Sequence, residues 1–351
     1  GICLPATANA SSKMSTSSIF LYAKHRRQFN MPLIRMEAVQ NKIASMLVNT
    51  WAIQAGVYVT NKLLDQGERP AVVSAIMKEQ TTERGRQVLN DGMDIHAGSA
   101  ICKGENNILE KFYKSAPVGI TVEGSNTLTK NLIIFGQGLN KSHPYIYPVL
   151  DAIQRDDEVA FGESFSAIVS HAVGLYFKAF SASIWQSDML QLQTLQFACL
   201  SNFVALKGGA IKRDQSLSAD MATILSNLYL AHSIDIYEKD HNVSSLLRNT
   251  AIEGLVDENR VAFNRVLSNL GWGPLLWFMR SYRDRSYNIN RRLITEMLTN
   301  PKIMEKLQED IHISGGAAKL VVLDKLEKGS LEYEKLYDDV IQVGMYKIMQ
   351  D

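Results

Sequence analysis

The chain has 351 residues, of which 46% are hydrophobic and 21% are charged, as in an ordinary globular protein. Its formal net charge of +1 at pH 7 argues against a nucleic-acid partner. The three cysteines, Cys3, Cys102 and Cys199, stand far apart, so we expect neither a disulfide framework nor a zinc cage, and a reducing, cytoplasmic setting fits best.

The first residues, 1–5, have no basic region ahead of an apolar stretch and so do not resemble a signal peptide. They read as a chain entered in the middle of a domain, and we expect a fragment of a longer protein. We also expect no membrane-spanning helix, because we find no apolar run that approaches the ~20 residues such a helix needs. The most conspicuous candidate, residues 275–279, is far too short.

The first third of the chain has the periodicity of helices. Apolar residues between Met36 and Ile53 recur mostly every three or four positions, as on one buried helix face. This helix is predicted to continue to Leu64 and to stop at Gly67, which can adopt the left-handed conformation. Pro70 then suits the first turn of a second helix. No sustained alternation of apolar and polar residues is seen, so a sheet of any size is not expected.

Residues 92–126 are punctuated by glycine and proline, and we expect irregular backbone there, of the kind that often meets a ligand. A short helix is predicted over about 126–135. We place a domain boundary just after it, which divides residues 1–143 from an extension of residues 144–351.

The extension is predicted to be helical as well. Natural breaks fall at residues 156–157 and 214–219, and a late turn is predicted at 315–316. The helix that starts near Ser216 is amphipathic, with a serine as its expected N-cap. The whole chain is therefore predicted to be all-α.

Residues 120–130 carry the most chemical information. Glu123 stands in a tight turn beside Gly124, just before a predicted helix start. Gly124 lets the backbone or a flat ligand approach closely, and Ser125 or Asn126 can cap the helix, leaving amides that favour an anion or a polarised ring. A carboxylate held there away from water would have a raised pKa and could act as a base. On these residues alone, a surface turn is the more common explanation.

This stretch resembles the signature of the acyl-CoA dehydrogenase family, in which a Glu-Gly-Thr/Ser/Ala turn supplies the catalytic base. Residues 121–124, 128–129 and 134–138 are most similar to the bacterial long-chain branch of that family, which acts in fatty-acid degradation. That branch also carries a helical C-terminal extension.

Two earlier segments resemble the same family in order and approximate spacing. The family has an Arg-x-x-Phe segment whose Arg binds the pyrophosphate of FAD, and Arg26 and Phe29 take those places. An arginine fork suits a pyrophosphate because its donors are planar and bidentate. Residues 93–100 fall where the family has a Gln-x-x-Gly-Gly turn that contacts the adenosine side of the partner subunit's cofactor. Gly98 matches this turn, and Asp94 replaces the usual Gln.

The resemblance assigns roles residue by residue. The catalytic base would be Glu123, the substrate would meet Gly124, and the cofactor would be bound by Arg26, Phe29, Asp94, Gly98, Ser125 and Thr127. The sequence departs from the family's usual residues at Asn30, Asp94, Ala97, Ala100, Thr127 and Lys130. His96, within the second segment, is expected to be a packing residue.

The resemblance implies that about residues 10–140 form the family's C-terminal four-helix bundle and that the remainder forms the helical extension. It implies FAD-dependent dehydrogenation of a fatty acyl-CoA to a trans-2-enoyl-CoA in fatty-acid β-oxidation. The implied partners are an electron-transfer flavoprotein or similar acceptor and a second copy in a homodimer. The implied location is the cytoplasm, with peripheral contact at the inner membrane left open. The N-terminal helical domain and the middle β domain of the family would be absent from this chain.

Two alternatives stay open. One is a helical dimerisation or interaction module without chemistry of its own. The other is an acyl-CoA oxidase-like enzyme on the same scaffold, which lets oxygen reach the reduced flavin.

Other signals are weaker. The glycines at 136 and 138 lack the third glycine of a dinucleotide-binding loop. The histidines form no i,i+4 pair, so no metal site is expected, and no GxSxG elbow indicates a hydrolase. Aromatic and basic residues alternate over 272–292 and could meet an anionic membrane surface. Ordinary arginine–aromatic packing is the more common role of such a stretch.

Overall fold

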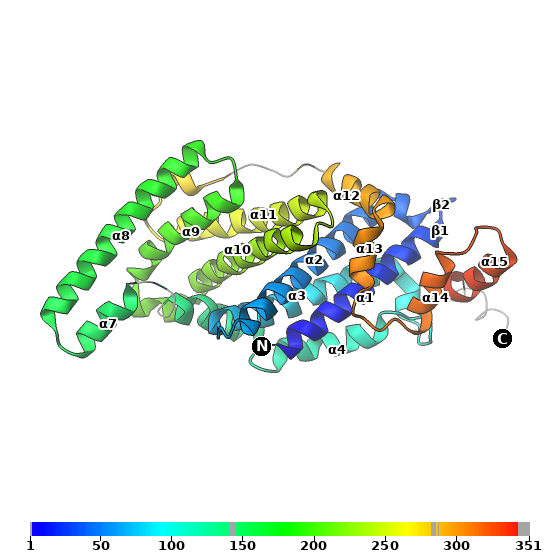
Figure 1. The fold of residues 1–351 in the computed structure, drawn as a ribbon, viewed down its shortest axis with the longest axis horizontal. Helices are drawn as coiled ribbons and strands as arrows, with labels where there is room; N and C mark the ends of the chain where they lie inside the picture. The colour runs from blue at the N-terminus through cyan, green and yellow to red at the C-terminus, as the bar shows by residue number, and fades with distance from the viewer. Residues whose placement is uncertain (1, 140–142, 144, 282–285, 287, 343–351) are drawn as a thin grey trace.

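The structure is a computed structural model that describes residues 2–139, 143, 145–281, 286 and 288–342. It is an elongated assembly of helices (Figure 1). In the described residues the only strands are β1 (Arg27–Gln28) and β2 (Met31–Pro32), which pair antiparallel as a small hairpin. The predicted all-α class is therefore confirmed.

The elements of the first segment are α1 (Cys3–His25), η1 (Leu33–Arg35), α2 (Glu37–Asp65), α3 (Ala71–His96), η2 (Ala97–Ala100), α4 (Glu110–Thr121), α5 (Asn126–Leu128) and the π-helix η3 (Thr129–Gln137). Those of the second are α7 (Ile146–Gln154), α8 (Glu158–Trp185), α9 (Met189–Ala205), η4 (Gly208–Lys212), α10 (Gln215–His241), α11 (Ser245–Asn269), η5 (Trp277–Met279), α12 (Asn288–Thr299), α13 (Pro301–Gln308), α14 (Gly315–Leu323), α15 (Leu331–Tyr337) and η6 (Asp338–Gln342).

Helices α1, α2 and α3 pack against one another, and α4 lies across α1 and α3. The predicted stop of α2 is confirmed, since α2 ends at Asp65 and Gly67 has φ +84°. The expected irregular stretch over 92–126 is wrong in two respects. Helix α3 continues through Gly92, where a β-carbon would press against Met46 and Leu109. Helix α4 then forms despite the proline inside it.

The extension packs along the first segment, and the two share one hydrophobic core. The Trp51 ring of α2 lies edge-on to Tyr237 of α10, with ring centroids 5.4 Å apart. A β-carbon added to Gly56 of α2 would lie 2.9 Å from Leu230 of α10 and from Met77 of α3, so glycine permits this close approach. The predicted boundary at 143/144 falls among residues of which only 143 and 145 onward are described.

Helices α7 and α8 form the end of the molecule opposite α15 (Figure 1). The predicted break at 156–157 is confirmed, because Asp157 caps α8 by accepting hydrogen bonds from the amides of Val159 and Ala160. The expectation of no membrane-spanning helix needs correction. By length and composition, α8 could cross a membrane, with a mean hydropathy of 1.3 over 18 residues. Its apolar residues are interleaved with glycine and serine, so no continuous apolar run marks it in the sequence.

The C-terminal elements return to the far end of α1. His25, the last residue of α1, contacts Tyr333 of α15 (3.0 Å) and Asp324 (2.9 Å) just after α14. Burial disfavours the charged form of Asp324, but hydrogen bonds from His25 and Lys24 outweigh it and hold its pKa at about 2. The predicted turn at 315–316 is instead the start of α14, where Gly315 has φ +59°. Likewise, Asp214 rather than a serine is the N-cap of α10, without a side-chain hydrogen bond.

Candidate active site

The Glu123 turn connects α4 to α5. Glu123 has φ +56° and Gly124 has φ +99°, so two consecutive residues adopt left-handed backbone. Glycine adopts this conformation freely, whereas for Glu123 it costs of order 1 kcal/mol. Strained, non-glycine backbone of this kind is concentrated at functional sites. Ser125 then occupies the N-cap of α5 but makes no side-chain capping hydrogen bond, contrary to expectation.

Lys78 of α3 holds this turn in place from below. Its Nζ donates to the carbonyl of Gly124 (2.5 Å) and to Oδ1 of Asn126 (2.7 Å). Asn126 in turn donates to Thr82 and Glu83, each at 2.9 Å. Lys78 carries no signal in the sequence, because it lies far upstream of the motif and only the packing of α3 brings it to the turn. The Glu123 turn is therefore a fixed feature rather than a loose loop.

Glu123 itself is exposed to solvent. Burial lowers the pKa of Lys78, and the neighbouring Glu123 carboxylate acts in the opposite direction. We expected a carboxylate enclosed away from water. None of the described residues covers the Glu123 side chain. A substrate, a partner or another part of the protein would have to enclose it.

Beside the turn lies an open polar groove of about 680 Å³, lined by Thr127 and Lys130 among others. Glu79 lies at its base, and burial raises the pKa of this carboxyl while Lys130, 4.0 Å away, opposes the shift. Arg84 crosses the groove and contacts Asn227 and Glu258, each at 2.8 Å, which ties α3 to α10 and α11. Thr127 thus faces a charged groove, and Ser125 lies next to it at the turn.

The second group of predicted site residues lies at the other end of α1. Phe29 and Asn30 are the two loop residues of the β1–β2 hairpin, with φ +51° and +63°. Positive φ at both loop positions is the type I′ geometry that fits the twist of a hairpin. Asn30 tolerates positive φ at a position where the resemblance leads us to expect glycine. For Phe29 positive φ is strained, because its β-carbon approaches the backbone. Phe29 is also 83% exposed, so the hairpin presents its ring to solvent.

Next to the hairpin is a cavity of about 480 Å³. Its lining includes Tyr22, Arg26, Leu33, Val39, Lys42, Asp94, His96, Gly98 and Ile341. Arg26 is half-buried and donates to the carbonyl of Ile341 (3.2 Å). Asp94 accepts from Lys42 (2.6 Å). A β-carbon at Gly98 would meet no atom of the chain within 4 Å, so the absence of a side chain at Gly98 leaves open space at this side of the cavity. The structure therefore brings Arg26, Asp94 and Gly98 together at one cavity.

His96 closes one side of that cavity. Its ring packs edge-on against Tyr22, with centroids 4.6 Å apart, and burial lowers its pKa from 6.5 to about 4. This buried, neutral ring is the packing residue that we expected.

We predict that His96 makes stability depend on pH between about 6.5 and 4. Its folded pKa is depressed, so the unfolded chain binds a proton in this window while the folded chain does not. The stabilisation is complete above pH 6.5 and is lost as the pH falls, by about 3 kcal/mol in total. Urea unfolding of wild type and His96→Leu near neutral pH and near the lower limit measures this. An equally steep pH dependence in both proteins would contradict the assignment.

The two groups are far apart in one chain. Lys78, under the Glu123 turn, and Asp94, at the Arg26 cavity, both lie on α3. The helical rise of 1.5 Å per residue places these two positions about 24 Å apart. The turn after α4, which carries Glu123, and the β1–β2 hairpin, which follows Arg26, thus lie at opposite ends of the same bundle (Figure 1).

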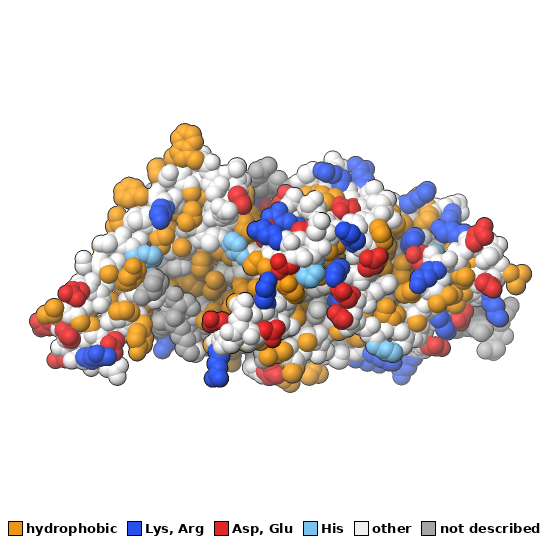
Figure 2. All heavy atoms as spheres, in the orientation of Figure 1, with side chains coloured by type: hydrophobic (Ala, Val, Ile, Leu, Met, Phe, Trp, Pro, Cys, Tyr) orange, Lys and Arg blue, Asp and Glu red, His pale blue; other side chains and the backbone are white. Residues whose placement is uncertain are grey.

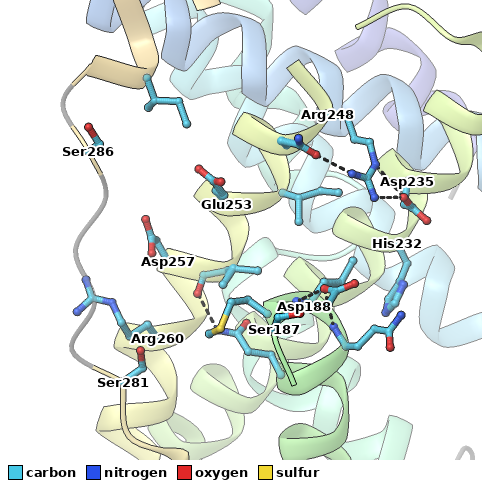
Figure 3. A pocket seen from close by; sticks show the side chains of 18 residues that line it. Ser187, Asp188, His232, Asp235, Arg248, Glu253, Asp257, Arg260, Ser281 and Ser286 are labelled. Carbon is cyan, nitrogen blue, oxygen red and sulfur yellow. Dashed lines mark hydrogen bonds and ion pairs between the residues drawn. The ribbon is translucent and has the colours of Figure 1, made fainter. Parts of the chain in front are cut away.

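A further cavity, of about 590 Å³, lies within the extension between α9, α10 and α11, with Ser281, Ser286 and Ile289 also in its lining (Figure 3). Arg248 projects into it and is held by Asp235 through its Nε (2.8 Å), and Asp188 at its edge caps α9. His232 contacts Thr194 (3.0 Å). No sequence signal pointed to this cavity. The Arg248–Asp235 pair suits a structural role, and we assign no chemistry to it.

Two sequence profiles together account for nearly all of the chain. The profile described as acyl-CoA dehydrogenase, C-terminal domain, matches residues 6–136, and the profile described as acyl-CoA dehydrogenase, C-terminal, bacterial type, matches residues 140–344. The chain belongs to the acyl-CoA dehydrogenase family. The resemblance drawn from the Glu123 and Arg26 segments is confirmed at this level, as is the all-α fold of the family's C-terminal domains.

Individual relatives agree with the family. The chain is 30% identical over 112 residues to a 3-(aryl)acrylate reductase of Clostridium sporogenes, a match covering 32% of this chain and 29% of that protein. It is 22% identical over 233 residues to a probable acyl-CoA dehydrogenase of Bacillus subtilis, covering 60% and 37%. The chain thus spans well under half of the length of these curated relatives.

Solved structures share the fold. An acyl-CoA dehydrogenase of Bacillus anthracis complexed with FAD superposes with a TM-score of 0.66 at 18% identity, covering 87% of this chain and 55% of that one. The acyl-CoA oxidase 3 of Yarrowia lipolytica superposes with a TM-score of 0.55 at 15% identity, covering 99% and 53%. At such identities these acyl-CoA dehydrogenase and oxidase structures establish the fold only.

Proposed function

We propose that this chain is the C-terminal part of an FAD-dependent acyl-CoA dehydrogenase that converts fatty acyl-CoA to trans-2-enoyl-CoA in fatty-acid β-oxidation. The observation that carries the proposal is Glu123, a carboxylate presented at positive φ in a turn fixed by Lys78, within a chain of this family. Strained backbone at a non-glycine residue is concentrated at functional sites. Glu123 has value as a base once a substrate covers it.

In this proposal Glu123 removes the proton α to the thioester carbonyl. That proton is too weakly acidic for an ordinary carboxylate in water, so exclusion of water from the base, together with hydrogen bonds to the carbonyl oxygen, has to reduce the difference in acidity between the substrate and Glu123. Gly124 leaves room for the substrate beside the base. FAD supplies the redox chemistry when bound, since no side chain here can accept the β hydrogen as hydride.

The Arg26 cavity fits part of the cofactor. Arg26 supplies positive charge for a pyrophosphate, and Leu33 and Val39 supply an apolar wall for a base or ribose. The cavity's 480 Å³ is too small for a complete flavin dinucleotide beside a substrate, so this end suits the adenosine diphosphate part. Phe29 and Gly98 lie where a ring or ribose can approach closely.

The separation of the two ends supports a homodimer. Glu123 has to lie at the reactive ring of the flavin, and Arg26 at its pyrophosphate. The separation of about 24 Å along α3 is too long for one FAD to reach both residues of a single copy. A two-fold dimer resolves this, because each flavin then meets Glu123 of one copy and Arg26 of the other. Exposure of both Glu123 and Phe29 in the single chain fits such sharing.

We predict that Arg26→Glu in the full-length protein weakens FAD binding by roughly 100-fold, through loss of a charge-assisted pair and gain of a repulsion. Arg27→Glu is the matched control. Arg27 is the next residue but is exposed and donates to the carbonyl of Asn30 in the hairpin (2.8 Å). Titration of the apoprotein with FAD, followed by flavin fluorescence, measures both. Equal effects of the two variants would remove Arg26 from the cofactor site.

A second function on the same scaffold is an acyl-CoA oxidase, favoured by the shared fold with the Yarrowia enzyme. Acyl-CoA-dependent reduction of an artificial electron acceptor, without peroxide, is expected for a dehydrogenase that passes its electrons to an electron-transfer flavoprotein. Stoichiometric peroxide would indicate an oxidase. A protein that forms stable dimers but neither binds FAD nor reduces the acceptor would be an interaction module.

A further inference from the structure

Helix α8 is apolar on both faces. Its inner face packs against α7, α9 and η5, where Tyr176 and Phe180 make edge-on ring contacts with Phe278 at 5.6 and 5.4 Å. Its outer face carries large hydrophobic side chains that nothing in the described chain covers. Only 6% of its most apolar 18-residue window is buried. A helix that is apolar all round is normally enclosed, by protein or by lipid.

The exposed hydrophobic residues extend from α8 onto the neighbouring segment before and within η5. We call this the Trp185 surface: Phe177, Phe180, Ile184, Trp185, Trp272, Leu275 and Trp277. The buried Phe278 and the Tyr176 hydroxyl, which donates to the carbonyl of Leu275 (3.1 Å), hold the two segments together. In Figure 2, hydrophobic side chains line the outer edge over α8. The two segments that carry this surface are therefore fixed side by side.

Tryptophan is concentrated there. Of the chain's four tryptophans, Trp51 is fully buried, while Trp185, Trp277 and Trp272 are 83%, 65% and 44% exposed. The large apolar ring of an exposed tryptophan is unfavourably solvated in water. The same flat, amphipathic ring is favoured at the boundary between lipid headgroups and acyl chains. We expected packing for the stretch 272–292. That holds for Phe278 and for Trp272, whose ring lies edge-on to Phe203 with centroids 5.8 Å apart. It does not hold for Trp277, and residues 282–285 and 287 lie outside the described part.

The charges along α8 are segregated. Its acidic residues lie at or just before its N-terminal end, at 156–158 and Glu163. The Trp185 surface lies at its C-terminal end. From residue 164 to 185 the only ionised side chain other than a histidine is Lys178, and from 271 to 280 it is Arg280. Asp188 lies nearby, but its carboxylate accepts the first amides of α9. The Trp185 surface is thus apolar with cationic groups, which is complementary to anionic lipid.

We propose that the Trp185 surface docks the protein on the surface of an anionic lipid bilayer. Helix α8 lies on the membrane rather than crossing it, because its inner face is occupied by α9 and η5. Phe177, Ile184 and the tryptophans enter the headgroup region, and Lys178 and Arg280 meet lipid phosphates. A second copy of the chain would instead have to supply anionic groups for both cations.

The test is co-sedimentation of the purified protein, as this chain and in full length, with phosphatidylcholine vesicles with and without phosphatidylglycerol. We expect binding to the anionic vesicles that weakens with added salt, and quenching of tryptophan fluorescence by brominated lipid. The double variant Trp185→Ser/Trp277→Ser should weaken partitioning at least about tenfold, and Lys178→Glu/Arg280→Glu should remove the preference for phosphatidylglycerol. Leu331→Ser is the matched control, because Leu331 is 87% exposed at the opposite end.

Absence of vesicle binding in both forms of the protein would overturn the proposal. So would binding that the tryptophan variant leaves intact. Sedimentation velocity tests whether a second copy of the chain occupies the Trp185 surface. A self-association that Trp185→Ser/Trp277→Ser abolishes, without vesicle binding, would assign the surface to a second copy instead. Circular dichroism of each variant confirms that the helices are retained.

Discussion

Full-length protein with Glu123→Gln should lose acyl-CoA dehydrogenation by about 10³-fold, since a positioned general base typically contributes 10²–10⁴. Glutamine keeps the size and most contacts of the side chain but cannot accept the α-proton. The variant should still bind FAD normally, because Glu123 lies about 24 Å, along α3, from the level of the Arg26 cavity. Anaerobic mixing with acyl-CoA, followed by bleaching of the flavin, measures the chemical step directly.

Glu110→Gln is a matched control for this variant. Glu110 lies in the first turn of α4, the helix that leads to Glu123, and pairs with Lys114 on the surface. Its replacement should leave flavin bleaching unchanged within about twofold, as expected for an exposed pair. Near-normal bleaching in Glu123→Gln would remove Glu123 as the base. Loss of bound FAD in that variant would show instead that the turn belongs to the cofactor site.

Trp51→Ala should give the largest loss of stability, about 3–5 kcal/mol in the free energy of unfolding. Trp51 is fully buried on α2 and contacts Tyr237 of the extension, so the cavity opens at the junction of the two segments. Because the core is continuous, the chain should still unfold in one transition. Urea denaturation followed by circular dichroism and by fluorescence measures both properties.

Trp277→Ala is the matched control, since Trp277 is exposed. It should change the unfolding free energy by no more than about 0.5 kcal/mol. Loss of helical signal from only part of the chain in Trp51→Ala would show that the two segments fold independently.

Much of the fold could be predicted from local pattern. The stop at Gly67 and the break at Asp157 follow from the conformational freedom of glycine and the capping ability of aspartate, which are local properties. Helix α4 could not be predicted, because its proline and glycine disfavour a helix that packing on α1 and α3 then stabilises. The membrane-spanning length and composition of α8 could not be recognised from a continuous apolar run, because its apolar residues are interleaved with glycine and serine and its hydropathy is high only as an average over 18 residues.

The candidate site was predictable only as separate pieces. The resemblance to the family's motifs singled out Glu123, Arg26, Phe29 and Gly98, but nothing in the sequence indicated that they lie at opposite ends of one bundle. Lys78 escaped notice because its role depends on α3 passing beneath the turn. The exposure of Glu123 also could not be predicted, since it depends on which parts of the fold pack beside the turn.

The shared-site account rests on Glu123 of one copy and Arg26 of another serving the same flavin. Mixing Glu123→Gln with Arg26→Glu by co-expression tests this directly, because each variant alone is expected to be nearly inactive at limiting FAD. In a mixed two-fold dimer one site has both defects and the other has none. Random pairing should therefore restore about a quarter of the wild-type activity. If both residues serve a site within one copy, no chain in the mixture is intact, and activity staying at the level of the separate variants would contradict the account.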